Sequence, residues 1–192
     1  MKSGGVRRVR RKRSRRGWRR PILSSDGVAM PDDEIVIFPE AEIIPSFAIV
    51  FMRMMFAHAA FEEEVRRLQS AITNNPKFDK RWDTSERPQR MATLIENHSG
   101  SVQDQEASEV SRVLTDAIDP CRQRNLLTHG RWWRFDPKTL TIKIRGERKG
   151  EPESANFTEA KILSIASKLR ALATDLYMVR REIEHRRGDH DI

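Results

Sequence analysis

Two long stretches of the chain carry apolar residues at steps of three and four, the spacing that lines one face of an α-helix. The first begins near Ser46 and stops at Asn74-Asn75-Pro76, which predicts a helix over about residues 46–73. The second begins at Phe157-Thr158, a hydrophobic staple followed by an N-cap, and predicts a helix to about residue 187. The expected inner faces consist of Phe47, Phe51, Met54, His58, Phe61, Val65, Leu68 and Ile72, and of Ile162, Ile165, Leu169, Leu172, Leu176, Val179 and Ile183.

The region between these stretches predicts a short helix followed by a third long one. The short helix spans about residues 89–98, and the long one begins at Ser101 and closes at Gly130. Apolar residues resume after Pro120, so we expect this proline to kink the long helix rather than end it. Its expected inner face consists of Val102, Val110, Val113, Leu114, Ala117, Ile118, Cys121, Leu126 and Leu127.

A β-hairpin is predicted directly after Gly130. Residues 131–135 form its first strand, and in residues 139–145 Leu140, Ile142 and Ile144 alternate with polar positions. Residues 146–157 read as a charged loop. The predicted fold is therefore mainly α, a four-to-five-helix bundle with one small β-hairpin at about residues 131–145, in a domain of residues 31–192.

Positive charge is concentrated at the N-terminus. Of the 36 lysines and arginines, 11 lie in residues 1–20, which contain no acid; this leaves 25 basic against 28 acidic side chains in the rest of the chain. Such a block repels itself and buries little apolar surface, so we expect residues 1–30 to be a disordered basic tail. Its natural partner is a polyanion, namely RNA, DNA or an anionic membrane surface, and a merely solvated leader is the alternative.

Several classes of function are excluded by what the sequence lacks. A single cysteine, Cys121, rules out an internal disulfide framework and a cysteine-based zinc site, and it reads as a buried packing residue. We find no glycine-rich phosphate loop and no zinc-binding H-E-x-x-H helix. No stretch approaches the roughly 18 apolar residues of a membrane span. We therefore expect a cytoplasmic protein with no cofactor, no metal and no membrane partner.

One segment of the third long helix combines residues suited to phosphodiester chemistry. Asn125 and His129 are four residues apart and share a helical face, and Arg124 precedes them directly. An arginine holds a phosphate through two hydrogen bonds, a neutral imidazole exchanges a proton near pH 7, and an amide orients a neighbouring group. Together they supply a base, a charge stabiliser and an orienting group without a metal. Further candidates for nucleic-acid contact surround the segment, namely Arg122, Arg131, Trp132, Trp133 and Arg134.

The segment Arg124-Asn125-Leu-Leu-Thr-His129 resembles the signature of the HEPN superfamily (higher eukaryote and prokaryote nucleotide-binding domain). The resemblance implies a helical bundle with the motif late in a helix. It also implies a homodimer in which two motifs face one cleft, and metal-independent cleavage of RNA by Arg124, Asn125 and His129. Members often act in toxin–antitoxin or phage-defence systems, so an antitoxin or defence-system protein is an expected partner.

Two other interpretations stay open on the sequence alone. Many members of the superfamily have lost cleavage, so the chain is alternatively a non-catalytic helical module that binds nucleic acid or protein. In a third view it is a structural interaction protein whose motif is accidental. At the residue level, Arg124 then pairs with an acid and His129 caps its helix.

Overall fold

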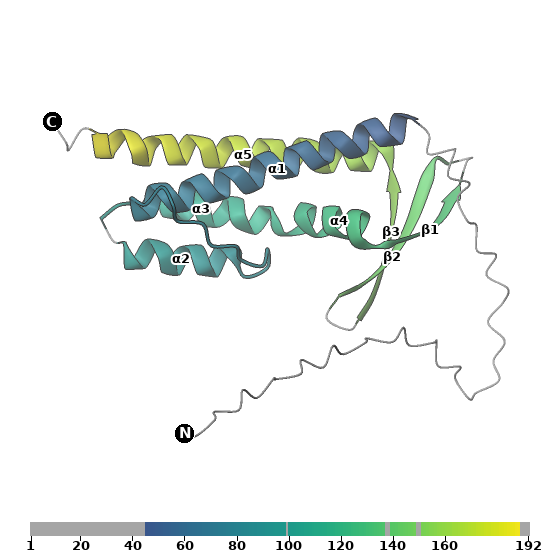
Figure 1. The fold of residues 1–192 in the computed structure, drawn as a ribbon, viewed down its shortest axis with the longest axis horizontal. Coiled ribbons are helices and arrows are strands. Elements are labelled where there is room, and N and C mark those ends of the chain that lie inside the picture. The colour runs from purple at the N-terminus through teal and green to yellow at the C-terminus, as the bar shows by residue number, and fades with distance from the viewer. Residues whose placement is uncertain (1–44, 99, 137–138, 149–150, 189–192) are drawn as a thin grey trace, which may run out of the picture. The chain divides into compact units, whose positions relative to one another are not determined.

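Two long helices, α1 (Pro45–Thr73) and α5 (Glu159–Gly188), pack against each other along most of their length and form one layer of a bundle (Figure 1). Three shorter helices cover them: α2 (Arg87–Asn97), α3 (Asp104–Asp116) and α4 (Ile118–His129). The computed structural model describes residues 45–98, 100–136, 139–148 and 151–188. Predictions for the basic tail and for residues 21–44 lie outside the described residues.

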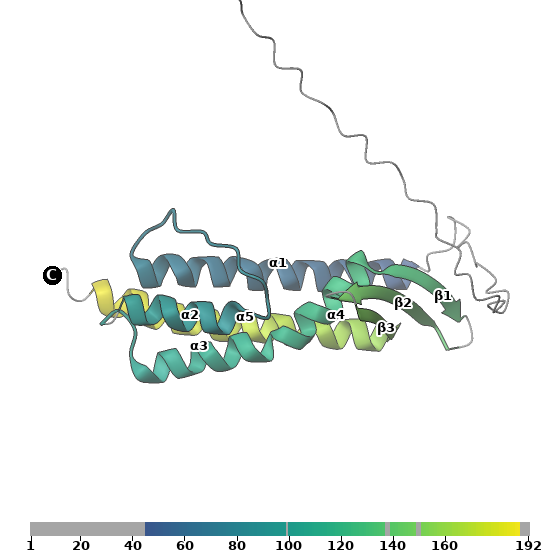
Figure 2. The same ribbon diagram turned by 90° about the horizontal axis from the view of Figure 1, so that it is seen from below.

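A three-stranded antiparallel sheet, in the order β1-β2-β3, lies at the end of the bundle where α4 ends and α5 begins (Figures 1 and 2). Its strands are β1 (Arg131–Asp136), β2 (Thr141–Arg148) and β3 (Glu151–Thr158). Ile142 and Ile144 of β2 and Phe157 of β3 are buried and join the helical core. The sheet is therefore part of the same core as the bundle.

The mainly helical class and both long helices are confirmed. All seven residues of the predicted inner face of α5 are buried, and on α1 the predicted face is buried except for the half-buried Phe51 and His58. Thr158 caps α5 as expected, because its hydroxyl accepts a hydrogen bond from the amide of Lys161 at 3.2 Å. None of the described helices is both long and apolar enough to cross a membrane.

Two details of the predicted helices and turns are wrong. The expected third long helix is two helices that divide at Ala117, and Pro120 lies in the first turn of α4. A proline is tolerated there because the first amides of a helix have no acceptor within the helix. Leu140 was expected to alternate inward on a strand, but it lies in the turn before β2 with φ 47° and 45% exposure.

The third strand was not expected, because residues 146–157 read as a charged loop. In the structure β3 pairs with β2 from Thr141↔Thr158 to Arg148↔Glu151. The strand is polar along most of its length, and only Ala155 and Phe157 supply apolar contacts to the core. An edge strand with so little apolar alternation depends on backbone pairing with its neighbour, which a hydrophobic pattern does not reveal.

Candidate functional site

The predicted motif lies at the end of α4, where the helix meets the sheet at very close range. Gly130 follows the last helical residue, and its amide donates to the carbonyl of Leu126 at 2.8 Å. A Cβ at Gly130 would lie 2.4 Å from the carbonyl oxygen of Leu126 and 2.5 Å from Cγ2 of Ile144. One at Gly146 would lie 2.6 Å from Cδ1 of Leu126. Glycine at these two positions lets the sheet lie directly against the motif.

A cavity of about 340 Å³ opens beside this junction and is lined by Asn125 and His129. Its other walls come from Gly130 and Gly146, from β3 and from the loop before α2. His129 is exposed, and no described residue forms a hydrogen bond or ion pair with its imidazole. The ring is thus open to a ligand in the cavity. This geometry differs from a histidine that caps its own helix through hydrogen bonds.

Arg124 occupies a different position from the other two motif residues. It is half-buried, and its Nη1 donates to Oδ1 of Asn125 at 2.9 Å. Its Nε is buried without a hydrogen-bond partner among the described residues. No carboxylate of the described residues forms an ion pair with it, so the interpretation of Arg124 as half of a salt bridge does not hold there. Asn125 and His129 therefore share the cavity, while Arg124 holds the amide of Asn125.

The arginine that lines the cavity with His129 is Arg122, one of the predicted nucleic-acid contacts. Its Nε donates to Oε1 of Glu153 on β3 at 2.6 Å. Both side chains are partly open to solvent. A ligand phosphate would therefore have to compete with Glu153 for this guanidinium. Arg131, another predicted contact, is exposed at the start of β1.

Trp132, predicted as a stacking surface for nucleic acid, is engaged in packing. Its indole Nε1 donates to the carbonyl of Leu127 at 3.0 Å, and its ring meets Phe51 of α1 edge to face with centroids 6.4 Å apart. The indole thus ties β1 to α4 and α1. For Trp133 and Arg134 the structure describes the backbone in β1, with a register shift between Trp132 and Arg134, and their side chains lie outside the described residues.

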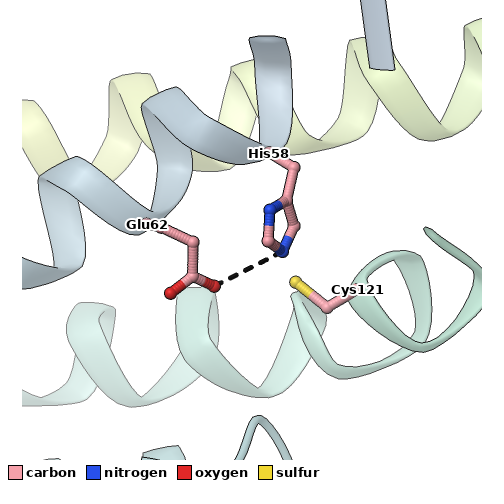
Figure 3. A group of neighbouring side chains, drawn as sticks. All are labelled: His58, Glu62 and Cys121. Carbon is pink, nitrogen blue, oxygen red and sulfur yellow. Dashed lines mark ion pairs between the residues drawn. The ribbon is translucent and has the colours of Figure 1, made fainter. Parts of the chain in front are cut away.

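A second polar cluster, of His58, Glu62 and Cys121, lies between α1 and α4 (Figure 3). Donor atoms of His58, Glu62 and Cys121 all lie within 4.8 Å of one another, and Nε2 of His58 is 3.5 Å from Oε1 of Glu62. Arg87, only 5% exposed, pairs with the same Glu62 carboxylate. Sequence reasoning treated His58 as an ordinary core histidine. The four-residue spacing of His58 and Glu62 was the available indication that they form one polar face.

The protonation of this cluster follows from burial and from two arginines. Burial lowers the pKa of His58, and the charges of Arg124 and Arg87 lower it further. Burial also raises the pKa of the Cys121 thiol to about 12. Near neutral pH the imidazole is therefore neutral and the thiol keeps its proton.

The three donors of this cluster do not form a favourable metal site. Cys121 would bind zinc as a thiolate, and here burial favours the thiol. Glu62 is already engaged by Arg87, and a cation would leave that buried guanidinium without its partner. The positive charges of Arg87 and Arg124 would also repel a cation.

The described geometry thus gathers an exposed histidine, an amide held by an arginine and an ion-paired arginine around one open cavity. The charge of Arg124 also acts on the partly buried His58 of the second cluster, whose pKa it lowers. No protein-family model, curated protein or solved structure matches this chain.

Proposed function

We propose that the chain is a metal-independent endoribonuclease of the HEPN type whose reaction centre is the cavity at the end of α4. The observation that carries the proposal is the state of His129, an exposed imidazole with no hydrogen bond from the described residues, next to the amide of Asn125. Such a ring is free to exchange a proton with a ligand, whereas a histidine with a structural role is normally hydrogen-bonded. A role in a toxin–antitoxin or phage-defence system, with a partner protein that controls the activity, follows from the resemblance.

In the proposed reaction His129 removes the proton from a ribose 2′-hydroxyl. The 2′-oxygen forms a bond to the adjacent phosphorus as the bond from phosphorus to the 5′-oxygen breaks. The 5′-oxygen leaves with a proton from water or from a second imidazolium, and the products end in a 2′,3′-cyclic phosphate and a 5′-hydroxyl. General base catalysis of this kind contributes about 10²–10⁴ in rate.

The remaining residues of the site have supporting roles. Asn125 lines the cavity and orients the hydroxyl or the phosphate, and Arg124 fixes the Asn125 amide through the hydrogen bond of 2.9 Å. Arg124 is thus a positioning residue in this conformation. Its guanidinium would bind the phosphate only after its hydrogen bond to Asn125 breaks. Arg122 also lines the cavity, and its guanidinium would bind the phosphate if the phosphate displaces Glu153.

A second copy of the chain would complete this sparse site. One imidazole serves as the base, and the partner copy's own motif supplies an acid for the leaving oxygen. We therefore expect a homodimer with residues 123–133 at or beside the interface. Light scattering at tens of micromolar, a generous concentration for an interface of standard size, should give twice the mass of one chain. A strict monomer would remove this part of the proposal.

One observation favours a second candidate, a non-catalytic module that binds RNA. In this structure Arg122 is paired with Glu153 and Arg124 is engaged with Asn125, so neither guanidinium of these two is directed at a phosphate in the cavity. In that case the site retains nucleic acid without cutting it.

Cleavage of RNA by the wild type and by His129→Ala separates the two candidates. The enzyme should cut RNA in the presence of EDTA, and His129→Ala should lower the rate by about 10²–10⁴. Thr128→Ala is a matched control, because among the described residues this neighbouring hydroxyl donates only to backbone carbonyls of its own helix. Equal rates for the wild type and His129→Ala, or complete loss with EDTA, would refute the mechanism. Binding without cleavage would establish the module.

A further inference from the structure

A second and larger cavity, of about 780 Å³, adjoins the proposed reaction centre. It lies between α1 and the loop that connects α1 to α2, and it shares Thr84 and Asn125 with the cavity of His129. A ligand that extends from one cavity to the other would pass Asn125. The proposed function uses only the first cavity, so the second needs its own explanation.

The loop that covers this cavity is held in place by a buried glutamine. Gln69 of α1 is 1% exposed, and its amide both donates to the carbonyl of Lys80 at 3.0 Å and accepts from the amide of Lys80 at 3.1 Å. Ser70 adds a hydrogen bond to the carbonyl of Phe78. These contacts hold Lys80, Arg81 and Trp82 over the cavity, where Trp82 is half-buried and the two cations are exposed.

The wall of the cavity contains a buried guanidinium with a donor to spare. Arg87 is 5% exposed, and its Nη2 donates to Oε2 of Glu62 at 3.1 Å. Its Nη1 lies 3.0 Å from Oε1 of Glu62 but lacks the alignment of a hydrogen bond, and it has no other partner among the described residues. A buried donor of this kind is costly unless something satisfies it. His58 lies beside it in the same wall.

We propose that this cavity binds a nucleotide of single-stranded RNA next to the one whose phosphate is cut. The base lies against the half-buried indole of Trp82. Arg87 Nη1 is enclosed in this structure, and it donates to an acceptor on the edge of the base once the guanidinium turns toward the cavity. Lys80 and Arg81 lie at the rim of the cavity and bind the phosphate. Their charges are available for this contact, because neither forms an ion pair with a described residue. Unpaired bases are recognised in this manner, by stacking on an aromatic ring and by hydrogen bonds to their edges. This assignment rests on the proposed function, because it takes the cavity of His129 as the place where the neighbouring phosphate is cut.

The test is binding of a labelled RNA pentanucleotide to the full chain carrying His129→Ala, which prevents cleavage during the titration. Adding Trp82→Ala should weaken binding at least about fivefold, the low end of what one stacked base contributes. Trp82→Phe should keep most of the affinity. Phe56→Ala removes an aromatic ring that is 66% exposed on α1 and does not line the cavity, so it is the matched control and should change nothing. RNA duplex, whose bases are already stacked, should bind equally well with and without Trp82.

A second substitution keeps the test decisive if Trp82→Ala disturbs folding. Lys80→Ala with Arg81→Ala changes exposed side chains only, and it should reduce the salt dependence of binding by about 0.7 in log–log slope for each lost phosphate contact. Unchanged affinity in a folded Trp82→Ala protein, or an unchanged salt slope in the double variant, overturns the subsite. If the wild type cuts no RNA while Trp82 still contributes to binding, the proposed cleavage fails and the subsite stands. If the wild type cuts RNA but Trp82 has no effect on binding, the proposed cleavage stands and the subsite fails.

Discussion

At the scale of single residues, Arg124 links the two polar clusters on α4. It holds Asn125 for the cavity of His129, and its positive charge acts on His58 across the helix interface. The sequence predicted that Asn125 and His129 share a face, because that follows from helical spacing alone. It did not predict where Arg124 points, since adjacent residues diverge around a helix and the outcome depends on how α1 packs there.

The first prediction concerns the pKa of His58. Burial lowers this pKa first, and the charge of Arg124 lowers it further. Arg124→Ala should therefore raise the pKa of His58 relative to the wild type, and NMR titration of the imidazole resonances measures both values. Thr128→Ala, which leaves the charge in place, serves as the control. A pKa that stays the same or falls in Arg124→Ala would show that the guanidinium does not act on His58.

The same shift makes the stability of the fold depend on pH. The pKa of His58 is lower in the folded than in the unfolded chain, so folding favours the neutral ring. This contribution is present above the ordinary histidine pKa of about 6.5 and is lost as the pH falls through the lowered value. The free energy of unfolding should therefore fall more between pH 7 and pH 5 in the wild type than in His58→Gln. Urea unfolding at the two pH values measures the difference, and equal losses would contradict it.

At the scale of elements, the junction of α4 with the sheet determines the shape of the candidate site. The hydrophobic pattern was sufficient for α1, α5 and β2, because each carries a clear apolar face. It failed for β3, whose Glu153 pairs with Arg122, since a polar edge strand has no such pattern. The sequence predicted that Gly130 ends a helix. It did not predict that a side chain at this position would overlap Ile144, because that contact arises from tertiary packing.

Gly130→Ala tests this junction. The added methyl group would overlap the carbonyl of Leu126 and the side chain of Ile144, so either the helix end or the sheet must shift. Overpacking of this kind lowers the free energy of unfolding by about 1–3 kcal/mol, measurable by urea denaturation. Gly188→Ala, where no atom lies within 4 Å of the added methyl group, is the control and should be neutral or slightly stabilising. A neutral Gly130→Ala would mean that the sheet does not lie this close to α4.

At the scale of the whole molecule, the excess positive charge lies in a different part of the sequence from the residues that form the helical bundle. The 11 basic residues of positions 1–20 contrast with a remainder that has 25 basic and 28 acidic side chains. The folded part uses its own charges internally, as in Arg180 of α5, whose guanidinium bonds to Glu64 of α1 at 3.0 Å and to Glu184 at 2.7 Å. Attraction to RNA over long distances is therefore expected from the N-terminal residues rather than from the bundle.

Deletion of residues 1–20 should separate these two properties. Thermal stability should stay nearly unchanged, because these residues have 11 charges and little apolar surface to bury. Affinity for single-stranded RNA should fall, and its log–log salt slope should decrease by about 0.7 for each phosphate contact that is lost. Thermal melting and binding titrations at several salt concentrations measure the two effects. A deletion that unfolds the bundle would contradict this division of roles.

The central claim is that His129 activates a ribose 2′-hydroxyl without a metal. The most direct measurement compares one RNA oligonucleotide with a copy that carries a single 2′-deoxyribose at the cleaved position, both in EDTA, with product ends identified by mass spectrometry. We predict cleavage of the RNA to a 2′,3′-cyclic phosphate and a 5′-hydroxyl, and no cleavage at the substituted position. Cleavage of the 2′-deoxy copy at that position, or products ending in a 3′-hydroxyl and a 5′-phosphate, would contradict the claim.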